Sequence, residues 1–341
     1  MVKINGNKRN IRIALPSKGR LAESSLQLME DSGLKVKKPN ERQYQASIPS
    51  LPGVEVLFQR AGDIAVSVRD GIVDFGITGL DVVSETEDVD RNILVLLDQL
   101  GFGGCRLCAI VPEGAKNVCT MMDVQKLIGA EEGSLRVATK FPNLTRAFFE
   151  NHGFKDVDYI LAEGALEIAP LIGYADMITD LVSSGLTLRD NRLKVLDDGL
   201  ILESQACLIA SKKNLVDSHE VLEVARRLIE FIVAFLRAEK NVAVFANIRG
   251  DSPQQVAELV LGKKVIRGLQ GPTISRVITH QGENWFAVNL VIKKSDLAEA
   301  INELRSIGGS EVIVTPVNYI FEEEPEAYTR MLSKLQVSNG R

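Results

Sequence analysis

The first 240 residues repeat one pattern, in which a short apolar strand leads through a loop into a helix. Residues 11–15 form such a strand, the loop Pro16-Ser-Lys-Gly-Arg20 follows, and residues 21–31 have helical periodicity. Alternating strands and helices are typical of α/β domains with buried parallel strands. We expect further strands at residues 54–58, 75–79, 93–97, 105–111, 136–139, 159–161, 176–182 and 206–210, and further helices at 61–70, 144–152 (with Asn143 as N-cap), 166–173 and 219–239.

The length and the glycine distribution indicate more than one domain. A chain of 341 residues exceeds one ordinary hydrophobic core. Gly101-Phe-Gly-Gly104 is glycine-rich and suits a hinge between two lobes. We therefore expect catalytic lobe I at residues 1–104 and 192–240, and catalytic lobe II at residues 105–191.

From residue 241 the order of elements changes. Strand, helix, two strands that form a hairpin, helix and strand follow one another, which is the β-α-β-β-α-β order of a ferredoxin-like unit. We assign this unit to residues 241–325 and a charged tail, expected as a surface helix, to residues 326–341. A small appended unit suits ligand sensing or assembly more than chemistry.

Charge and hydropathy exclude several classes of protein. The net charge is −5 with a pI near 5.5, and no basic stripe is present, which disfavours nucleic-acid binding. No apolar run reaches the ~18 residues that span a bilayer, and residues 1–10 lack a signal-peptide core, so we expect a cytoplasmic protein without membrane contact. Cys105 and Cys108 lie on an expected strand, where residues three apart face opposite sides, so we interpret them as structural thiols.

An acidic residue followed by a hydroxyl-rich loop is the main candidate for chemistry. The strand at residues 176–182 brings Asp180 to its end, and Ser183-Ser-Gly-Leu-Thr187 follows at once. Successive backbone N–H groups in such a loop bind anions, and the hydroxyls add donors for a phosphate. The carboxylate of Asp180 is placed to accept hydrogen bonds from sugar hydroxyls. These five loop residues alone leave an ordinary turn with Gly185 in the left-handed conformation equally open.

A longer spaced pattern surrounds this loop. It consists of Glu167, Gly173, Ala175, Ile178, Asp180, Leu181, Ser184, Gly185, Thr187 and Leu188. In these ten positions over 22 residues the chain resembles the signature of the ATP phosphoribosyltransferases. Residues 15–21, 74–79 and 141–146 resemble other loops of that family, and residues 271–275 with Trp285 resemble the regulatory domain of its long, histidine-regulated form.

The resemblance implies a fold, a reaction and a set of partners. The fold is a two-lobed catalytic half, similar to type II periplasmic binding proteins, followed by the ferredoxin-like regulatory domain. The reaction is attack of N1 of the ATP adenine on the anomeric carbon of phosphoribosyl pyrophosphate. Mg²⁺ bound to the pyrophosphate is the implied cofactor, because Mg²⁺ keeps its waters and takes few protein ligands. Histidine is the implied inhibitor, and dimers and hexamers are the implied assemblies.

The resemblance also implies the site residues. Those for phosphoribosyl pyrophosphate are Glu167, Asp180, Ser183, Ser184, Gly185, Leu186 and Thr187; those for ATP are Lys18, Gly19, Arg20, Arg60, Thr78 and Gly79; those with a catalytic role are Asp180, Glu167, Lys18 and Arg20; and Thr273 is placed near the regulatory histidine. Solvated loop charges at Lys18 and Arg20 and a surface ion pair at Arg60 stay open as alternatives. We expect the acidic run at residues 85–90 to be a solvated loop.

Three other functions compete with this interpretation. A two-lobed binding protein without catalysis would leave the phosphate loop unexplained. A phosphoribosyltransferase for another base typically has two adjacent acids, whereas Leu181 and Val182 follow Asp180 here. A catalytically idle paralogue is disfavoured by the intact loops around Asp180 and around Lys18 and Arg20.

Overall fold

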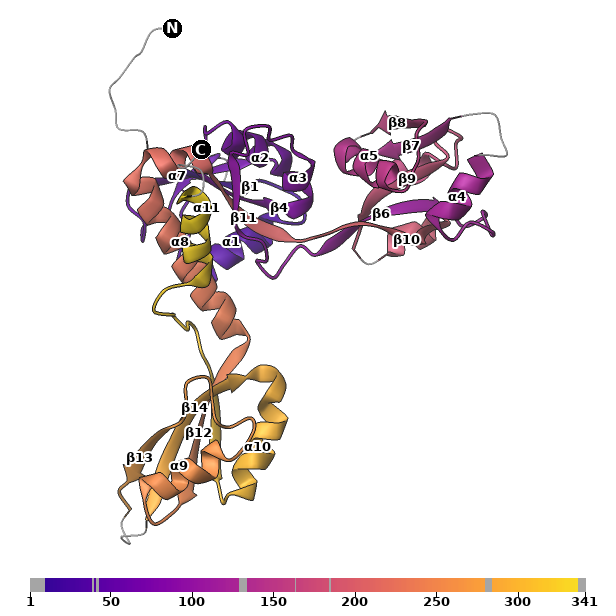
Figure 1. Cartoon of the computed structure of the whole chain (residues 1–341). Coiled ribbons are helices and arrows are strands. Elements are labelled where there is room, and N and C mark those ends of the chain that lie inside the picture. Colours follow the sequence, from indigo (N-terminus) through magenta and orange to yellow (C-terminus); the bar gives the residue numbers. More distant parts are fainter. Residues whose placement is uncertain are drawn as a thin grey trace. The chain divides into compact units, whose positions relative to one another are not determined.

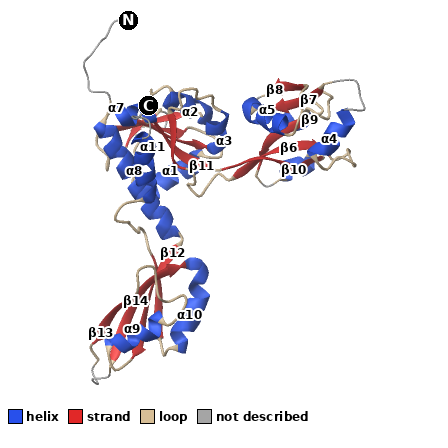
Figure 2. Cartoon of the chain, in the orientation of Figure 1, coloured by secondary structure: helices blue, strands red, loops and turns tan. Residues whose placement is uncertain are grey.

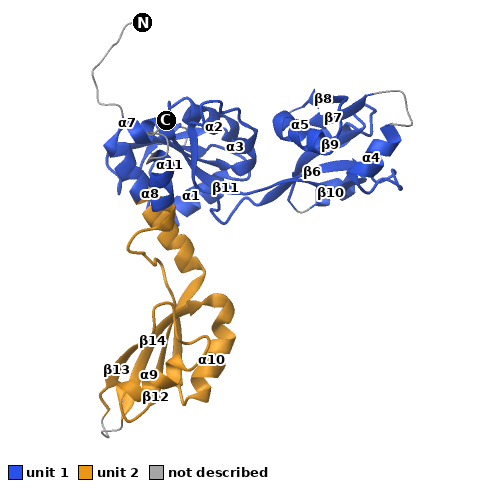
Figure 3. Cartoon of the chain, viewed as in Figure 1, with its two compact units in different colours: residues 1–226, 329–341 blue, residues 227–328 orange. Residues whose placement is uncertain are grey.

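The computed structural model describes residues 10–38, 40, 43–128, 134–162, 164–183, 185–279 and 284–336. The chain divides into two compact units (Figure 3). Residues 1–226 and 329–341 form unit 1, and residues 227–328 form unit 2. Unit 1 contains two separate sheets, whereas unit 2 contains one.

The first sheet of unit 1 has six strands in the order β2-β3-β1-β4-β11-β5. The strands are β1 (Ile11–Pro16), β2 (Gln45–Ser47), β3 (Val54–Gln59), β4 (Phe75–Gly79), β5 (Ile93–Leu97) and β11 (Ala206–Ser211), and the helices that accompany them are α1 (Ala22–Asp31), α2 (Ala61–Arg69), α3 (Leu80–Glu85), α7 (Lys212–Asp217) and α8 (His219–Glu239). β1 is parallel to both β3 and β4. Helices α1, α2 and α3 directly follow these three strands, so the connecting loops open at one edge of the sheet.

The second sheet of unit 1 has five strands in the order β10-β6-β9-β7-β8. The strands are β6 (Cys105–Pro112), β7 (Leu135–Thr139), β8 (Val157–Leu161), β9 (Met177–Val182) and β10 (Leu193–Ser204), and the helices are α4 (Met121–Ile128), α5 (Pro142–Asn151), the short 3₁₀ helix η1 (Leu166–Ile168) and α6 (Leu186–Asp190). β7 is parallel to β8 and β9, so the ends of β7 and β9 reach the same edge. We call the six-stranded part lobe I and the five-stranded part lobe II.

Three details correct the sequence analysis. β10 pairs with β6 of lobe II, although we assigned residues from 192 onward to lobe I. α5 begins at Pro142 with Phe141 as N-cap, not with Asn143, because proline suits the first helical turn. The helix expected at residues 166–173 is one turn, η1, since Pro170 has no N–H to donate and Gly173 adopts φ +71°.

Two stretches of backbone connect the lobes near the glycine-rich segment. The Leu100 N–H donates to the Ala206 carbonyl at 3.1 Å, and the Ala206 N–H donates to the Phe102 carbonyl at 3.0 Å. Figure 1 shows β6 and the continuous β10–β11 stretch running between the lobes. Gly103 has φ +67°, which favours glycine, and a Cβ atom there would lie 2.2 Å from a terminal methyl group of Leu21, which would have to shift.

Unit 2 confirms the ferredoxin-like order. Its elements are β12 (Asn241–Arg249), α9 (Pro253–Leu261), β13 (Thr273–Val277), β14 (Trp285–Lys293), η2 (Lys294–Asp296), α10 (Leu297–Ser306) and β15 (Ser310–Pro316), and the sheet order is β13-β14-β12-β15. Figure 2 labels strands β12, β13 and β14 and helices α9 and α10 of this unit. Val256 of α9 and Leu304 of α10 share one buried core with alternate residues of β12 and β14. The other side of the sheet is left to line a cavity described below. In the tail, α11 (Glu326–Gln336) is a helix as expected, but its Met331 is buried rather than at the surface.

The close approach of α2 to β4 yields a stability test. A Cβ atom at Gly76 would lie 2.4 Å from the Ile64 side chain. We expect Gly76→Ala to lower the free energy of unfolding by about 1–3 kcal/mol, because the core must shift to admit the methyl group. Gly114→Ala is the matched control, since nothing lies within 4 Å of its Cβ position. Urea unfolding of both variants would measure the difference, and equal stabilities would contradict this packing.

Candidate active site

Loops of both lobes surround a cavity of about 930 Å³ in unit 1. Its walls come from the carboxyl ends of parallel strands in each sheet, where α/β proteins commonly bind ligands. Seven of the expected site residues line it: Lys18, Gly19, Arg20, Arg60, Gly79, Glu167 and Asp180. The fold therefore brings together residues that lie up to 162 positions apart in the sequence (18 to 180).

Asp180 lies in β9 and its carboxylate is partly buried. The Leu181 N–H donates to it at 2.7 Å. Burial raises the pKa of Asp180 above its ordinary value, and the charge of Glu167 adds to that rise, while the Leu181 N–H and Lys140 oppose it. A carboxylate that the protein solvates incompletely is suited to accepting hydrogen bonds from a ligand.

Arg20 is held in place by protein groups of lobe I and the hinge. Its Nη2 lies 3.3 Å from Oδ1 of Asp81, and its Nη1 donates to the Gly103 carbonyl. The Asp81 side chain is 3% exposed and also accepts a hydrogen bond from the Ser204 hydroxyl at 2.6 Å. Gly79 leaves room for this carboxylate, because a Cβ atom there would lie 2.2 Å from Oδ1 of Asp81. Arg20 is therefore positioned by contacts, not a freely solvated charge.

Asp81 also lines the cavity, and our sequence analysis did not single it out. The signal for it was present, because an acid two residues after the glycine turn at Gly79 lies in the first turn of α3. Lys18 and Arg60 are exposed on the cavity wall. Neither has a carboxylate within 4.0 Å among the residues that the structure describes.

The other expected catalytic-site residues that the structure describes do not line this cavity. Thr78 is fully buried, and its hydroxyl donates to the Ala61 carbonyl at 2.9 Å, so it joins β4 to α2 and does not line the cavity. Ser183 lines a separate hollow of about 550 Å³ near the hinge. Gly185 has φ +73° and precedes α6, which contains Leu186 and Thr187. Ser184 lies outside the described residues, so the phosphate-binding role of this loop stays a prediction.

Three buried threonine hydroxyls form a closed ring behind the cavity wall. Thr179 Oγ1 lies 2.6 Å from that of Thr139, Thr139 lies 3.0 Å from Thr145, and Thr145 lies 2.7 Å from Thr179. Each hydroxyl donates once and accepts once in such a ring. Thr139 accepts a further bond from the Phe141 N–H at 2.9 Å. The ring joins β7, β9 and α5 immediately beside Asp180.

Glu85 makes a second contact with α5, from lobe I. Its carboxylate accepts hydrogen bonds from the N–H groups of Asn143 at 2.8 Å and Leu144 at 3.0 Å. A negative charge at a helix N-terminus is stabilising. Burial raises the pKa of Glu85, and the two N–H bonds oppose that rise. The expectation of a solvated loop at residues 85–90 is wrong for Glu85, because tertiary contact with a distant helix cannot be read from the acidic run.

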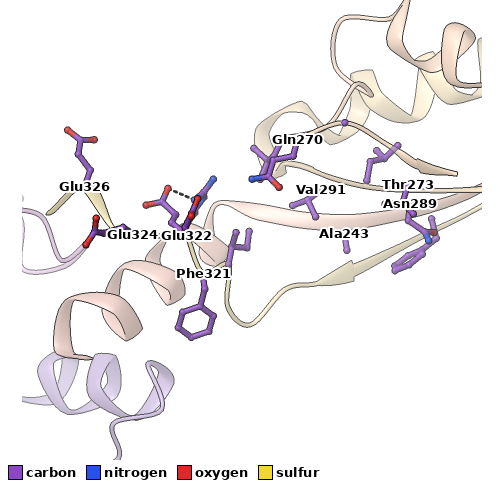
Figure 4. Close-up of a pocket in the computed structure, with 16 residues that line it drawn as sticks. Ala243, Gln270, Thr273, Asn289, Val291, Phe321, Glu322, Glu324 and Glu326 are labelled. Carbon is purple, nitrogen blue, oxygen red and sulfur yellow. Dashed lines mark hydrogen bonds and ion pairs between the residues drawn. The ribbon is translucent and has the colours of Figure 1, made fainter. Parts of the chain in front are cut away.

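A second cavity, of about 890 Å³, lies on the open side of the sheet in unit 2. Thr273 of β13 and Asn289 of β14 are register partners and lie close together there (Figure 4). The opposite wall is residues 320–324 with Glu326, in which Glu322 contacts Arg237. Thr273 is thus part of a cavity with both carboxylate and amide groups on its walls.

Some further findings concern cysteines, metals and membranes. Cys105 and Cys108 are free and buried. Burial raises the pKa of both thiols, which agrees with a structural role.

Within the described ranges, no group of three or more His, Cys, Asp or Glu could hold a metal ion. In the same part of the chain no helix is long and apolar enough to cross a membrane.

Known proteins match most of the chain. A family model described as "ATP phosphoribosyltransferase" matches residues 60–230, and one described as "HisG, C-terminal domain" matches residues 238–319. ATP phosphoribosyltransferase 2, chloroplastic, of Arabidopsis thaliana is 41% identical over 335 residues, which are 96% of this chain and 81% of the relative. The ATP phosphoribosyltransferase of Methanocaldococcus jannaschii is 36% identical over 310 residues, which are 91% of this chain and 99% of the relative.

One solved structure supports the fold alone. The ATP phosphoribosyl transferase (HisG:HisZ) complex from Thermotoga maritima has a chain with a TM-score of 0.51 and 24% identity to this one. The match covers 65% of this chain and 98% of that chain.

The pKa directions in lobe II predict opposite effects of two substitutions on stability. A raised pKa means that the fold disfavours ionised Asp180, so stability is lost as the pH rises through that pKa. Asp180→Asn should therefore raise the melting temperature at neutral pH, and the gain should shrink in acid. Thermal unfolding over a pH series would measure it.

Asp176→Asn is the matched control. Burial alone would raise the pKa of Asp176, but hydrogen bonds from Arg136, including one of 2.7 Å, outweigh burial and lower the pKa. Stability from this pair is present at neutral pH and lost as the pH falls through the lowered pKa. Asp176→Asn should thus lower the melting temperature at neutral pH. The same sign for both variants would contradict this electrostatic description.

Proposed function

Because the chain belongs to the ATP phosphoribosyltransferase family, we propose that it joins ATP to phosphoribosyl pyrophosphate, the first step of histidine biosynthesis. The resemblance seen in the sequence is confirmed for the long form, since the matches reach through both the catalytic and the C-terminal regions. The observation that carries the proposal is the cavity in unit 1, which is lined by seven of the residues expected to bind substrate.

The reaction exchanges one bond for another at the sugar. The lone pair of N1 of adenine attacks the anomeric carbon, the bond from that carbon to the pyrophosphate oxygen breaks, and pyrophosphate leaves with the electron pair. We infer that Asp180 and Glu167 accept hydrogen bonds from the ribose hydroxyls and hold the sugar for in-line attack. Their negative charges also stabilise the positive charge that develops on the sugar in the transition state.

The cations of lobe I serve the phosphates in this proposal. Arg20 is oriented by Asp81 and is available to a leaving group that gains negative charge, and Lys18 lies in the same loop. Arg60 and Gly79 lie on the side of the cavity that we assign to ATP. We assign the 5′-phosphate to residues 183–187, as the family resemblance implies, because successive backbone N–H groups and hydroxyls of such a loop bind anions. We assign Thr78 a structural role, because its hydroxyl joins β4 to α2 and it does not line the cavity.

Phosphoribosyltransferases generally need a divalent metal ion. We propose Mg²⁺, bound to the pyrophosphate of the substrate. Glu167 and Asp180 line the cavity, and carboxylate oxygens are the donors that Mg²⁺ prefers. When bound, the ion would neutralise charge on the pyrophosphate.

We propose that histidine binds in the cavity of unit 2 beside Thr273. The carboxylates at residues 322–324 suit an ammonium or imidazolium group, and the Asn289 and Gln270 amides suit hydrogen bonding. Histidine bound there would inhibit by favouring one of two arrangements of the enzyme. We also propose a homo-oligomer, dimer or hexamer, as the family resemblance implies.

Purified protein with ATP, phosphoribosyl pyrophosphate, Mg²⁺ and pyrophosphatase should form phosphoribosyl-ATP. The ultraviolet absorbance of this product measures the rate. Asp180→Asn should lower kcat/KM by about 100-fold or more, because a group that contacts the transition state is lost. Asp176 does not line the cavity, so Asp176→Asn should keep most activity. Histidine should suppress the wild-type rate. Folded wild-type protein without product would contradict the proposal and favour a binding protein.

A further inference from the structure

Lys140 lies next to Asp180 at the edge of the lobe II sheet, and the sequence analysis gave it no role. β7 and β9 are parallel, and Thr139 and Thr179 are register partners, so the following residue of each strand reaches the same edge. Both Lys140 and Asp180 line the cavity. Although burial raises the pKa of Asp180, the charge of Lys140 is near enough to offset part of that rise.

The distribution of charge gives Lys140 a particular place in the cavity. Lobe I contributes three cations to the cavity, at Lys18, Arg20 and Arg60. Among the described residues of lobe II that line it, Lys140 is the only basic one, beside the two acids Glu167 and Asp180. A ligand with several phosphates would meet net negative charge on this wall without Lys140.

Lys140 combines a fixed backbone with an accessible ammonium group. Thr139, which precedes it, belongs to the buried hydroxyl ring, and Phe141, which follows it, is 4% exposed and donates its N–H to Thr139 Oγ1. The Lys140 side chain itself is exposed. In the described part of the chain no carboxylate lies within ion-pair distance of it. These features describe a cation that the fold positions and that no described carboxylate pairs.

We propose that Lys140 binds the pyrophosphate group of phosphoribosyl pyrophosphate from the lobe II side and stabilises it as it leaves. This inference rests on the proposed function. With the ribose hydroxyls assigned to Asp180 and Glu167, and the 5′-phosphate to residues 183–187, the pyrophosphate is the remaining anion of that substrate beside Asp180. It gains negative charge as its bond to the anomeric carbon breaks, so a nearby cation acts most strongly in the transition state.

The test compares Lys140→Met with Lys140→Arg and with Lys155→Met, a control at an exposed lysine of lobe II outside the cavity. Lys140→Met should lower kcat/KM for phosphoribosyl pyrophosphate by about 10- to 100-fold, which is the range for losing a charged hydrogen bond. KM for ATP should change by less than about threefold, and Lys140→Arg should restore most of the loss. Lys155→Met should match the wild type.

Product inhibition distinguishes the two phosphate groups. Without pyrophosphatase, the inhibition constant of pyrophosphate should rise by a similar factor in Lys140→Met, whereas that of ribose 5-phosphate should stay unchanged. If Lys140→Met weakened inhibition by ribose 5-phosphate and left inhibition by pyrophosphate unchanged, Lys140 would contact the 5′-phosphate, and the proposal would be overturned. A change confined to the acid limb of the pH profile would assign it to tuning Asp180 and would also overturn it.

Wild-type kinetics separate this inference from the proposed function. Folded wild-type protein that forms no product would remove the proposed function itself. An active wild type whose Lys140→Met variant has unchanged kcat/KM would remove only the role of Lys140, which would then be a solvated surface lysine.

Discussion

The hydroxyl ring of Thr139, Thr145 and Thr179 connects the core of lobe II to the residues that line the cavity. All three side chains are fully buried, so each hydroxyl needs a partner inside the protein. The ring supplies those partners and ties two parallel strands to the start of α5. One residue beyond the ring, Lys140 and Asp180 line the cavity, so their separation depends on the β7–β9 register, to which the ring adds side-chain contacts.

Lobe I reaches the same region by different contacts. Asp81 and the Gly103 carbonyl orient Arg20, and the Glu85 carboxylate binds the first N–H groups of α5. Glu85 and α5 therefore join the lobes beside the cavity, whereas the glycine-rich segment joins them at the hinge. Because a ligand in the cavity would contact both lobes, these contacts determine how the lobes meet around it.

Local patterns in the sequence predicted much of the fold, and tertiary contacts explain what was missed. The strand–loop–helix alternation and the order of unit 2 are local signals, and both are found in the structure. β10 was missed because Asp197, Asp198 and Gly199 interrupt its apolar pattern, and the register shifts there. The loops around Lys18 and Asp180 were identifiable from motifs. Nothing local indicates that threonines 6 and 40 positions apart form one ring, or that Glu85 binds a helix 58 residues away.

The hydroxyl ring positions the wall of the cavity that carries Asp180 and Lys140. The most direct measurement is kcat/KM for phosphoribosyl pyrophosphate in Thr179→Val and Thr179→Ser, at a temperature where circular dichroism shows both to be folded. We predict a loss of about tenfold or more for valine, because small displacements at a reacting centre are costly, and recovery to within about threefold of wild type for serine. Thr179→Val with wild-type kcat/KM would contradict a positioning role of the ring, since the ring would then serve stability alone.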